Sequence, residues 1–296
     1  MYYVAMKAIS RIAAVVITSS LIVGFGHPVA FASGCTGFAQ GSGTAQSPYL
    51  VSSAAELTAV ANCLATGNHF KQTADIDLGG QASPFVRIGS QATPFRGNYD
   101  GDNYEIQNLY FNGTGYAGLF GSLNGATVTN VKIKNGAIQS TNSFAGLLAG
   151  YITNSTVSDI VLQGSVSSTS LVGGLTGMTQ STRSFIDRIM ADVTVTTTSS
   201  NAGGLIGQVE FQSATVQDVF VKGSVNSNTG QMSGGVVGYG ISPIIRRAVS
   251  VATVTGAQNH RGGLIGDMVN TSTLEDSFYL DTAVTSLASN FGVSKT

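Results

Sequence analysis

Charged residues are scarce in this 296-residue chain, because Asp, Glu, Lys and Arg together make up only 10% of it. Soluble domains usually contain about a quarter. The low charge and the formal net charge of -1 exclude the basic surface of a nucleic-acid-binding protein and the polybasic patch that attracts anionic membranes. The polar residues are mainly Ser, Thr, Asn and Gln, which suit short-range hydrogen bonding to uncharged partners such as sugars. We therefore expect no nucleic-acid partner.

Long apolar runs are missing beyond residue 24. The apolar segment 12–24 has 13 residues, fewer than the roughly 20 that a membrane-spanning helix needs. It follows Lys7 and Arg11 and precedes a small-residue cleavage pattern at 30–32, as in a secretory signal peptide. We predict a signal peptide at 1–32, no membrane span in the mature protein, and export to the periplasm, cell surface or extracellular medium. Its removal leaves 12 basic and 15 acidic residues, a formal charge of -3.

Cysteine is nearly absent, since the chain has only Cys35 and Cys63. Two cysteines are too few for a structural zinc site, and the compartments that receive exported proteins favour oxidation of such a pair. A disulfide between them closes a loop of under 30 residues, for which the chain-entropy estimate is roughly 3 kcal/mol. We predict this disulfide, and we predict neither a metal site nor a cofactor.

Catalytic motifs are missing as well. The three histidines, His27, His69 and His260, form no His-Glu-x-x-His metallopeptidase motif, and no Gly-x-Ser-x-Gly sequence marks a nucleophilic serine. His260, Arg261 and Asp267 come nearest to a local cluster of reactive side chains. We favour a non-catalytic protein and keep a polysaccharide lyase or hydrolase of the β-helix type as an alternative.

What the chain does have is a short glycine-rich line that occurs six times. Each copy reads Gly, then Leu or Val, then any residue, then Gly or Ala, and the first glycines stand at positions 118, 146, 174, 204, 235 and 263. A spacing of 28 to 31 residues indicates one structural unit per repeat, stacked on its neighbours.

Two further strands are predicted in each repeat. Apolar and polar residues alternate after the glycine lines, clearly in 127–134, 156–163 and 215–222 and less regularly in 184–191, 243–250 and 273–280. Such alternation predicts a strand with one buried face. A third short strand follows, centred on an apolar residue such as Val166. Three strands per repeat predict an all-β parallel β-helix. We expect one stack of inward residues, namely Leu119, Leu147, Leu175, Leu205, Val236 and Leu264.

This series of motifs resembles the GLUG-motif family of bacterial surface and secreted proteins, as found in the N-terminal part of IgA-specific metallopeptidases. The chain also matches the family's opening segment, at 48–52, 55–57, 73–78, 94–101 and 104–109. The resemblance therefore runs from about residue 47 to the end. It implies a right-handed β-helix in an exported protein, and it implies no single activity.

The two ends of the predicted solenoid differ from its middle. Residues 53–65 have apolar residues at helical spacing after Ser53, a favourable N-cap, which predicts a short helix over the first coil. We divide the chain into a signal peptide (1–32), an N-terminal cap with irregular coils (33–111), the six-repeat β-helix (112–281) and a tail (282–296). The tail either folds over the last coil or continues into a longer product.

The candidate ligand-binding residues are outward pairs that flank the inward valines of the third strands. They are Ser165 and Ser167, Thr194 and Thr196, Ser224 and Asn226, and Thr253 and Thr255. Neighbouring strands lie about 4.8 Å apart, so these side chains would form a regular wall. We predict a secreted or cell-surface adhesion or interaction module that binds a glycan or a surface protein through this wall.

Ice or a crystalline polymer is an alternative ligand for the same wall, although Ser, Asn and Gln139 interrupt the flat threonine face that ice binding needs. The neighbouring face, which carries Lys132, Val161, Phe220 and Val249, is interpreted as non-binding.

Four acidic residues recur with the repeat, namely Asp159, Asp187, Asp218 and Asp276. Asn130 and Arg247 occupy the same place in other repeats. We interpret these positions as a turn corner at which Asp bonds local backbone amides, and we assign them no catalytic role.

Overall fold

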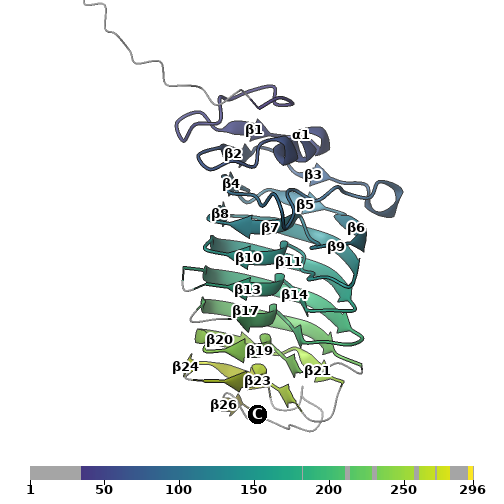
Figure 1. The fold of residues 1–296 in the computed structure, drawn as a ribbon, viewed down its shortest axis with the longest axis vertical. Coiled ribbons are helices and arrows are strands. Elements are labelled where there is room, and N and C mark those ends of the chain that lie inside the picture. Colours follow the sequence, from purple (N-terminus) through teal and green to yellow (C-terminus); the bar gives the residue numbers. More distant parts are fainter. Residues whose placement is uncertain are drawn as a thin grey trace, which may run out of the picture. The chain divides into compact units, whose positions relative to one another are not determined.

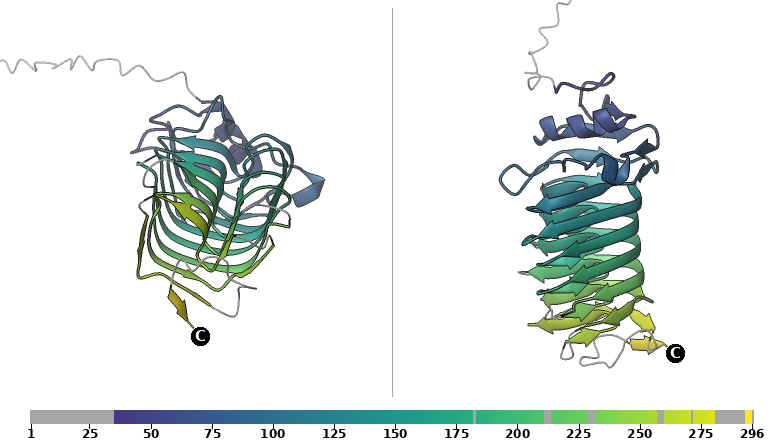
Figure 2. Two further views of the ribbon diagram at one scale, coloured as in Figure 1. Left: turned by 60° about the horizontal axis from the view of Figure 1, so that its bottom comes forward. Right: turned by 90° about the vertical axis from the view of Figure 1, so that its right-hand side faces the viewer.

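The chain folds into a β-solenoid in which nearly all regular structure is parallel β-sheet (Figure 1). The computed structural model describes residues 35–181, 183–210, 214–228, 232–256, 260–270, 272–280 and 293–295. Successive coils stack on one another through paired strands (Figure 2). The predicted all-β parallel β-helix with a short N-terminal helix is confirmed. The predicted signal peptide 1–32 lies outside the described residues.

Each central coil contributes one strand to each of three sheets. In the coil that begins at residue 202, β15 (Ala202–Gly203) is followed by β16 (Ile206–Glu210) and then by β17 (Thr215–Asn226). These strands pair in parallel with β18 (Ser233–Gly234), β19 (Val237–Ile241) and β20 (Ile244–Ser250) of the next coil. A given repeat position therefore returns at the same place in every coil.

Among the described residues, the three sheets have four, six and sixteen strands. The four-stranded sheet contains β12 (Val172–Gly173), β15, β18 (Ser233–Gly234) and β22 (Arg261–Gly262). The six-stranded sheet contains β7 (Phe120–Asn124), β10 (Ala149–Thr153), β13 (Thr176–Gln180), β16, β19 (Val237–Ile241) and β23 (Ile265–Val269). The sixteen-stranded sheet contains β1 (Tyr49–Val51), β2 (His69–Gln72), β3 (Ile76–Asp77), β4 (Asn98–Asp100), β5 (Glu105–Gln107), β6 (Tyr110–Thr114), β8 (Thr127–Thr129), β9 (Lys132–Thr141), β11 (Thr156–Ser168), β14 (Phe185–Thr197), β17, β20 (Ile244–Ser250), β21 (Thr253–Thr255), β24 (Thr273–Glu275), β25 (Phe278–Leu280) and β26 (Val293–Lys295).

The second and third strands predicted for each repeat are one continuous strand in the central coils. These are β11, β14 and β17, of 13, 13 and 12 residues. Each bends at a residue with left-handed φ, namely Asp159 (59°), Arg188 (53°) and Asp218 (53°). The bend interrupts the alternation of side chains but keeps the backbone pairing on both sides of it. The predicted division into two strands is therefore wrong for these coils.

The solenoid interior is filled by residues that occupy the same place in successive coils. Leu175, Leu205 and Val236 are fully buried neighbours in this core, and their backbones are joined by the bonds Leu175 N–Leu205 O and Leu205 N–Val236 O, both 2.9 Å. Gly204 precedes this stack and has no left-handed φ. It is required for space, because a Cβ there would lie 2.6 Å from Cγ1 of Val221 in β17.

The N-terminal cap combines the predicted disulfide and the predicted helix. Cys35 and Cys63 are bonded, with their Cα atoms 5.6 Å apart. The helix α1 (Ala54–Ala59) continues into the 3₁₀ turn η1 (Val60–Asn62) and is shorter than the predicted 53–65. Ser53 is its N-cap and accepts a bond from the Glu56 amide at 3.3 Å, while the Glu56 carboxylate accepts one from the Ser52 amide at 2.8 Å. A second 3₁₀ turn, η2 (Gly80–Ala82), follows β3.

The described part of the C-terminal tail is β26, which pairs in parallel with β25. Residues 281–292 lie outside the described residues, so the predicted choice between a folded tail and a longer product stays open. In the part of the chain that the structure describes, no helix has the length and hydropathy needed to cross a membrane.

Candidate functional site

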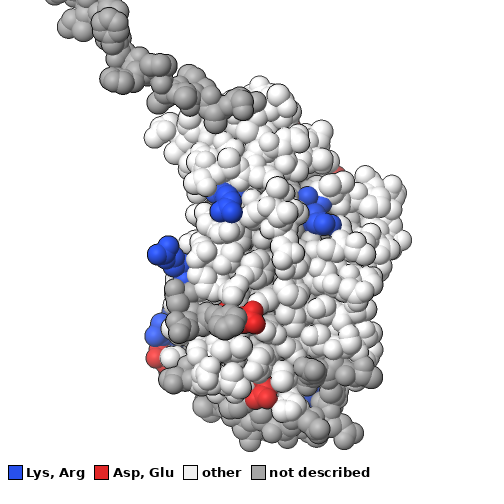
Figure 3. All heavy atoms as spheres, in the orientation of Figure 1, with Lys and Arg blue, Asp and Glu red and all other residues white. Residues whose placement is uncertain are grey.

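The eight predicted ligand-binding residues lie side by side on the outer face of β11, β14, β17 and β21. Their inward neighbours Val166, Val195, Val225 and Val254 are buried, so the eight side chains point away from the core. We call this surface the hydroxyl wall. The strand register places its first row as Ser165, Thr194, Ser224 and Thr253 and its second row as Ser167, Thr196, Asn226 and Thr255. Figure 3 shows one face of the molecule, on which charged groups are few and most of the described surface is uncharged.

Hydrogen bonds within the protein use little of the bonding capacity of the hydroxyl wall. Among the described residues, the hydroxyls of Ser165, Thr196 and Thr253 form no such bond, and the Ser224–Thr194 hydroxyl contact is long, at 3.5 Å. Gln139 lies in register with Ser167, so the second row mixes hydroxyl and amide groups. The wall therefore offers hydrogen bonds to a ligand over several coils, but it lacks the uniform threonine face suited to ice.

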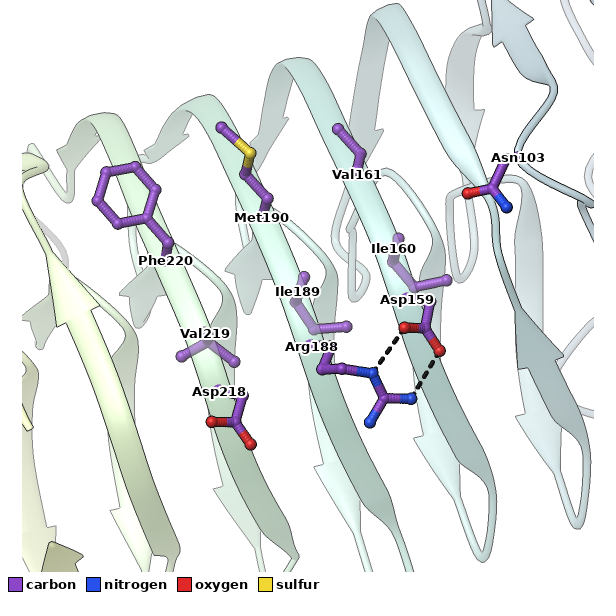
Figure 4. A pocket seen from close by; sticks show the side chains of 10 residues that line it. All are labelled: Asn103, Asp159, Ile160, Val161, Arg188, Ile189, Met190, Asp218, Val219 and Phe220. Atoms are coloured by element: carbon purple, nitrogen blue, oxygen red, sulfur yellow. Dashed lines mark hydrogen bonds and ion pairs between the residues drawn. The ribbon is translucent and has the colours of Figure 1, made fainter. Parts of the chain in front are cut away.

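A shallow groove of about 640 Å³ lies beside the hydroxyl wall on the same long strands (Figure 4). Its floor includes the outward side chains of Val161, Met190 and Phe220, which are in register in successive coils. Their exposed fractions of 38%, 46% and 36% are large for apolar residues with neighbours in register. We call this surface the apolar groove. The sequence analysis interpreted the face that carries Val161 and Phe220 as non-binding. The groove could have been predicted from the apolar residues that occupy outward positions of these alternating strands.

Charged side chains at the strand bends form one edge of the apolar groove. Arg188 donates to both carboxylate oxygens of Asp159, at 2.6 and 2.7 Å (Figure 4). Arg247 does the same to Asp218, at 2.7 and 2.6 Å. These charge-assisted bonds lower the pKa of both carboxyl groups. We call the alternating row Asp159, Arg188, Asp218 and Arg247 the charge ladder.

The predicted interpretation of the acidic positions needs two corrections. First, Asp187 does not align with Asp159 and Asp218, because the strand pairing places it opposite Ser158 and Gln217. Arg188 takes the bend position instead, and Asp187 is buried, with bonds from Arg188 and, at 3.0 Å, from Gln217. Second, the carboxylates of the ladder bond arginines of the next coil rather than local amides. Shifting the alignment of a strand by one residue moves every side chain to a different row. The sequence pattern did not reveal this shift at Asp187.

No group of three His, Cys, Asp or Glu side chains that could hold a metal ion occurs within the described ranges. Of the predicted local cluster, His260 and Asp267 are paired, with Nδ1 and Oδ2 2.9 Å apart. Arg261 is buried and donates to the Gly256 carbonyl at 3.0 Å. Two carboxylates line the apolar groove, those of Asp159 and Asp218, and each is bonded by an arginine of the next coil.

No family model matches the chain. Over 47% of its length the chain is 35% identical to halomucin of Haloquadratum walsbyi, and over 48% it is 33% identical to an immunoglobulin A1 protease of Streptococcus pneumoniae. These matches span only 2% and 7% of the two relatives. The relation to the protease confirms that part of the predicted resemblance, whereas the GLUG motif stays a prediction.

The fold also resembles a solved structure. A candidate immunoglobulin A1 protease from Bacteroides ovatus matches with a TM-score of 0.75 and 20% identity, over 88% of this chain and 87% of that chain. At this identity the match shows a shared β-solenoid fold. The sequence relatives and the disulfide, which indicates an oxidising compartment, fit a surface-associated β-helix module.

Proposed function

We propose that this chain is a non-catalytic interaction module of an exported protein, and that it binds a glycan through the hydroxyl wall. The observation that carries the proposal is the in-register array of outward hydroxyl and amide groups over four coils. Groups of this kind recognise neutral polar ligands. The proposal includes secretion or display at the cell surface, a role in adhesion, and a cleaved signal peptide at 1–32. It also includes the assignment of the glycine repeats as GLUG motifs.

Binding along the wall would be distributed over many weak contacts. One hydrogen bond contributes about 0.5–1.5 kcal/mol net, so useful affinity needs several coils or several copies acting together. A stack of paired strands is suited to this, because it holds equivalent side chains at a constant spacing without a deep pocket. The matched regions form small parts of the two relatives, which supports a role as an attached module; proteolytic activity is not part of the proposal.

The apolar groove supports a second candidate function, the binding of a surface protein. Exposed Met190 and Phe220 beside Arg188 are of the residue types enriched in protein interfaces. An ice or crystalline-polymer ligand is disfavoured by Asn226 and Gln139 in the second row of the wall. Polysaccharide cleavage is disfavoured because Asp159 and Asp218 are engaged by arginines of the next coil.

The contributions of the two surfaces to binding are distinguished by testing two variants of the mature protein on arrays of glycans and surface proteins. The wall variant combines Ser165→Tyr, Thr194→Tyr, Ser224→Tyr and Thr253→Tyr. The groove variant combines Val161→Gln, Met190→Gln and Phe220→Gln.

We expect the wall variant to lose glycan binding and the groove variant to keep it, with circular dichroism confirming that both stay folded. Loss of glycan binding in the groove variant alone would show that the wrong face was assigned. Binding to no glycan, or release of soluble sugars from a polysaccharide, would contradict the proposed function.

A further inference from the structure

A half-buried arginine, Arg87, lies in an irregular coil that is N-terminal to the coils of the hydroxyl wall. Arg87 belongs to the segment 84–88, which runs alongside β6, because the Phe85 amide donates to the Tyr110 carbonyl at 2.8 Å. The outward residue Asn112 of β6 is in register with Gln139, which is in register with Ser167 of the wall. Asn112, which lines one pocket with Arg87, therefore continues the second wall row in the N-terminal direction.

The surroundings of Arg87 hold its side chain in one place. Its guanidinium carbon lies 5.3 Å from the centre of the Phe111 ring, within cation–π range. Two glycines provide the space: a Cβ on Gly115 would lie 2.7 Å from Nη2 of Arg87, and a Cβ on Gly121 would lie 3.0 Å from its Cδ. A long cationic side chain seated in this way loses little further freedom when it binds a ligand.

The positive charge of Arg87 is poorly compensated by the protein. Nη1 donates to the Thr114 carbonyl at 3.2 Å, while Nε is buried and bonds no atom of the described residues. No described carboxylate lies within ion-pair distance, in contrast to the arginines of the charge ladder. Burial also lowers the pKa of the guanidinium, because desolvation disfavours the charged form.

A pocket of about 400 Å³ opens at this arginine. Its lining includes Phe85, Val86, Ser90 and Asn112 and contains no acidic side chain. Val86 is 68% exposed, so the pocket reaches the protein surface. It thus offers a guanidinium and an amide beside apolar surface, which together suit a carboxylated sugar ring, while the Ser90 hydroxyl is bonded to Thr93.

We propose that Arg87 binds the carboxylate of an acidic sugar, so that the glycan read by the hydroxyl wall is an acidic one. This inference rests on the proposed function for the extended ligand, but the Arg87 site itself does not require the wall. A guanidinium donates two parallel hydrogen bonds to a carboxylate, and in this pocket those bonds would compensate the charge that the protein leaves unpaired. The side-chain amide of Asn112 would bond a sugar hydroxyl.

The site is tested on its own by NMR titration of the isotope-labelled mature protein with sodium glucuronate. Glucose and sodium chloride at matched ionic strength are the controls. We expect the Arg87 Nε–Hε resonance to shift and saturate with glucuronate and to respond to neither control. No saturable shift with glucuronate, or an equal shift with sodium chloride, would overturn the proposal.

Its role in an extended ligand is tested with paired neutral and carboxylated oligosaccharides and the variant Arg87→Gln. Arg96→Gln is the matched control, since Arg96 is an exposed arginine in the next part of the same loop region. We expect Arg87→Gln to bind the carboxylated sugar about tenfold more weakly, the equivalent of losing one charge-assisted contact, with neutral-sugar binding unchanged.

Equal weakening by Arg96→Gln, or unchanged binding of the carboxylated sugar by Arg87→Gln, would contradict an anion site at Arg87. Failure of the proposed function can be distinguished from failure of the Arg87 site. If the wall is not a binding surface, the array shows no glycan binding, while glucuronate still shifts the Arg87 resonance in a saturable way. Nearly equal thermal unfolding of the two variants would confirm that both remain folded.

Discussion

Leu205→Ala tests whether the stack of leucines holds the central coils together. Leu205 is fully buried, between Leu175 in one neighbouring coil and Val236 in the other. Truncating its isobutyl group to a methyl group forfeits about 2 kcal/mol of transfer free energy, and an unrelaxed cavity adds a comparable amount. The flanking coils are tied to this one by backbone bonds of 2.9 Å, so they cannot collapse into the space. We expect a loss of about 4 kcal/mol in the free energy of unfolding.

Urea unfolding of the protein comprising residues 33–296, followed by circular dichroism, measures this loss. Thr194→Ala is the control, because Thr194 is an exposed residue of the neighbouring coil and surface changes typically alter stability by no more than about 0.5 kcal/mol. A loss below about 1 kcal/mol for Leu205→Ala, or a loss equal to that of the control, would refute the reasoning. Such a result would mean that the coils adjust independently of the stacked side chains.

Three further predictions concern the cap, the charge ladder and the wall. Cys63→Ser should expose the N-terminal cap to proteolysis before the later coils, since coils are stabilised mainly by neighbours; simultaneous cleavage throughout would contradict this. Because the carboxyl pKa values of Asp159 and Asp218 are lowered in the folded state, their contribution to stability is fully present above pH about 4 and is lost as pH falls through the lowered pKa values. Asp159→Asn should flatten that acid dependence in a pH series of thermal unfolding, change stability at pH 7 by less than about 1 kcal/mol because the pair is exposed, and leave ligand binding intact. Thr194→Ala should weaken glycan binding by about 1 kcal/mol or less, and complete loss of binding in this folded variant would instead indicate a compact site.

Much of the fold could be predicted because a repeat multiplies a weak signal. One Gly-Leu-x-Gly line is uninformative, but six at 28 to 31 residues require a stacked architecture. The disulfide between Cys35 and Cys63 followed from there being a single pair in a chain predicted to be exported, and the helix start at Ser53 followed from its capping chemistry.

The predictions were wrong where the side-chain alternation is interrupted but the backbone pairing continues. The bends at Asp159, Arg188 and Asp218 do not end the strands, because a left-handed residue can turn the chain while the ladder continues on both sides. Asp187 was misplaced by one residue for the same reason. The sequence has no direct marker of left-handed φ when the residue is arginine, which rarely adopts it.

The sequence by itself determined that this protein is a parallel solenoid with an outward row of hydroxyl groups, because the period of the repeat and the alternation within strands act locally along the chain. Tertiary structure alone decided which charged and exposed apolar residues of different coils meet. Register between coils determines the Asp159–Arg188 pair and the groove floor formed by Val161, Met190 and Phe220. It also determines the surroundings of Arg87, whose buried Nε bonds no atom of the described residues. A shift of one residue alters these contacts and scarcely changes the composition or periodicity of either strand.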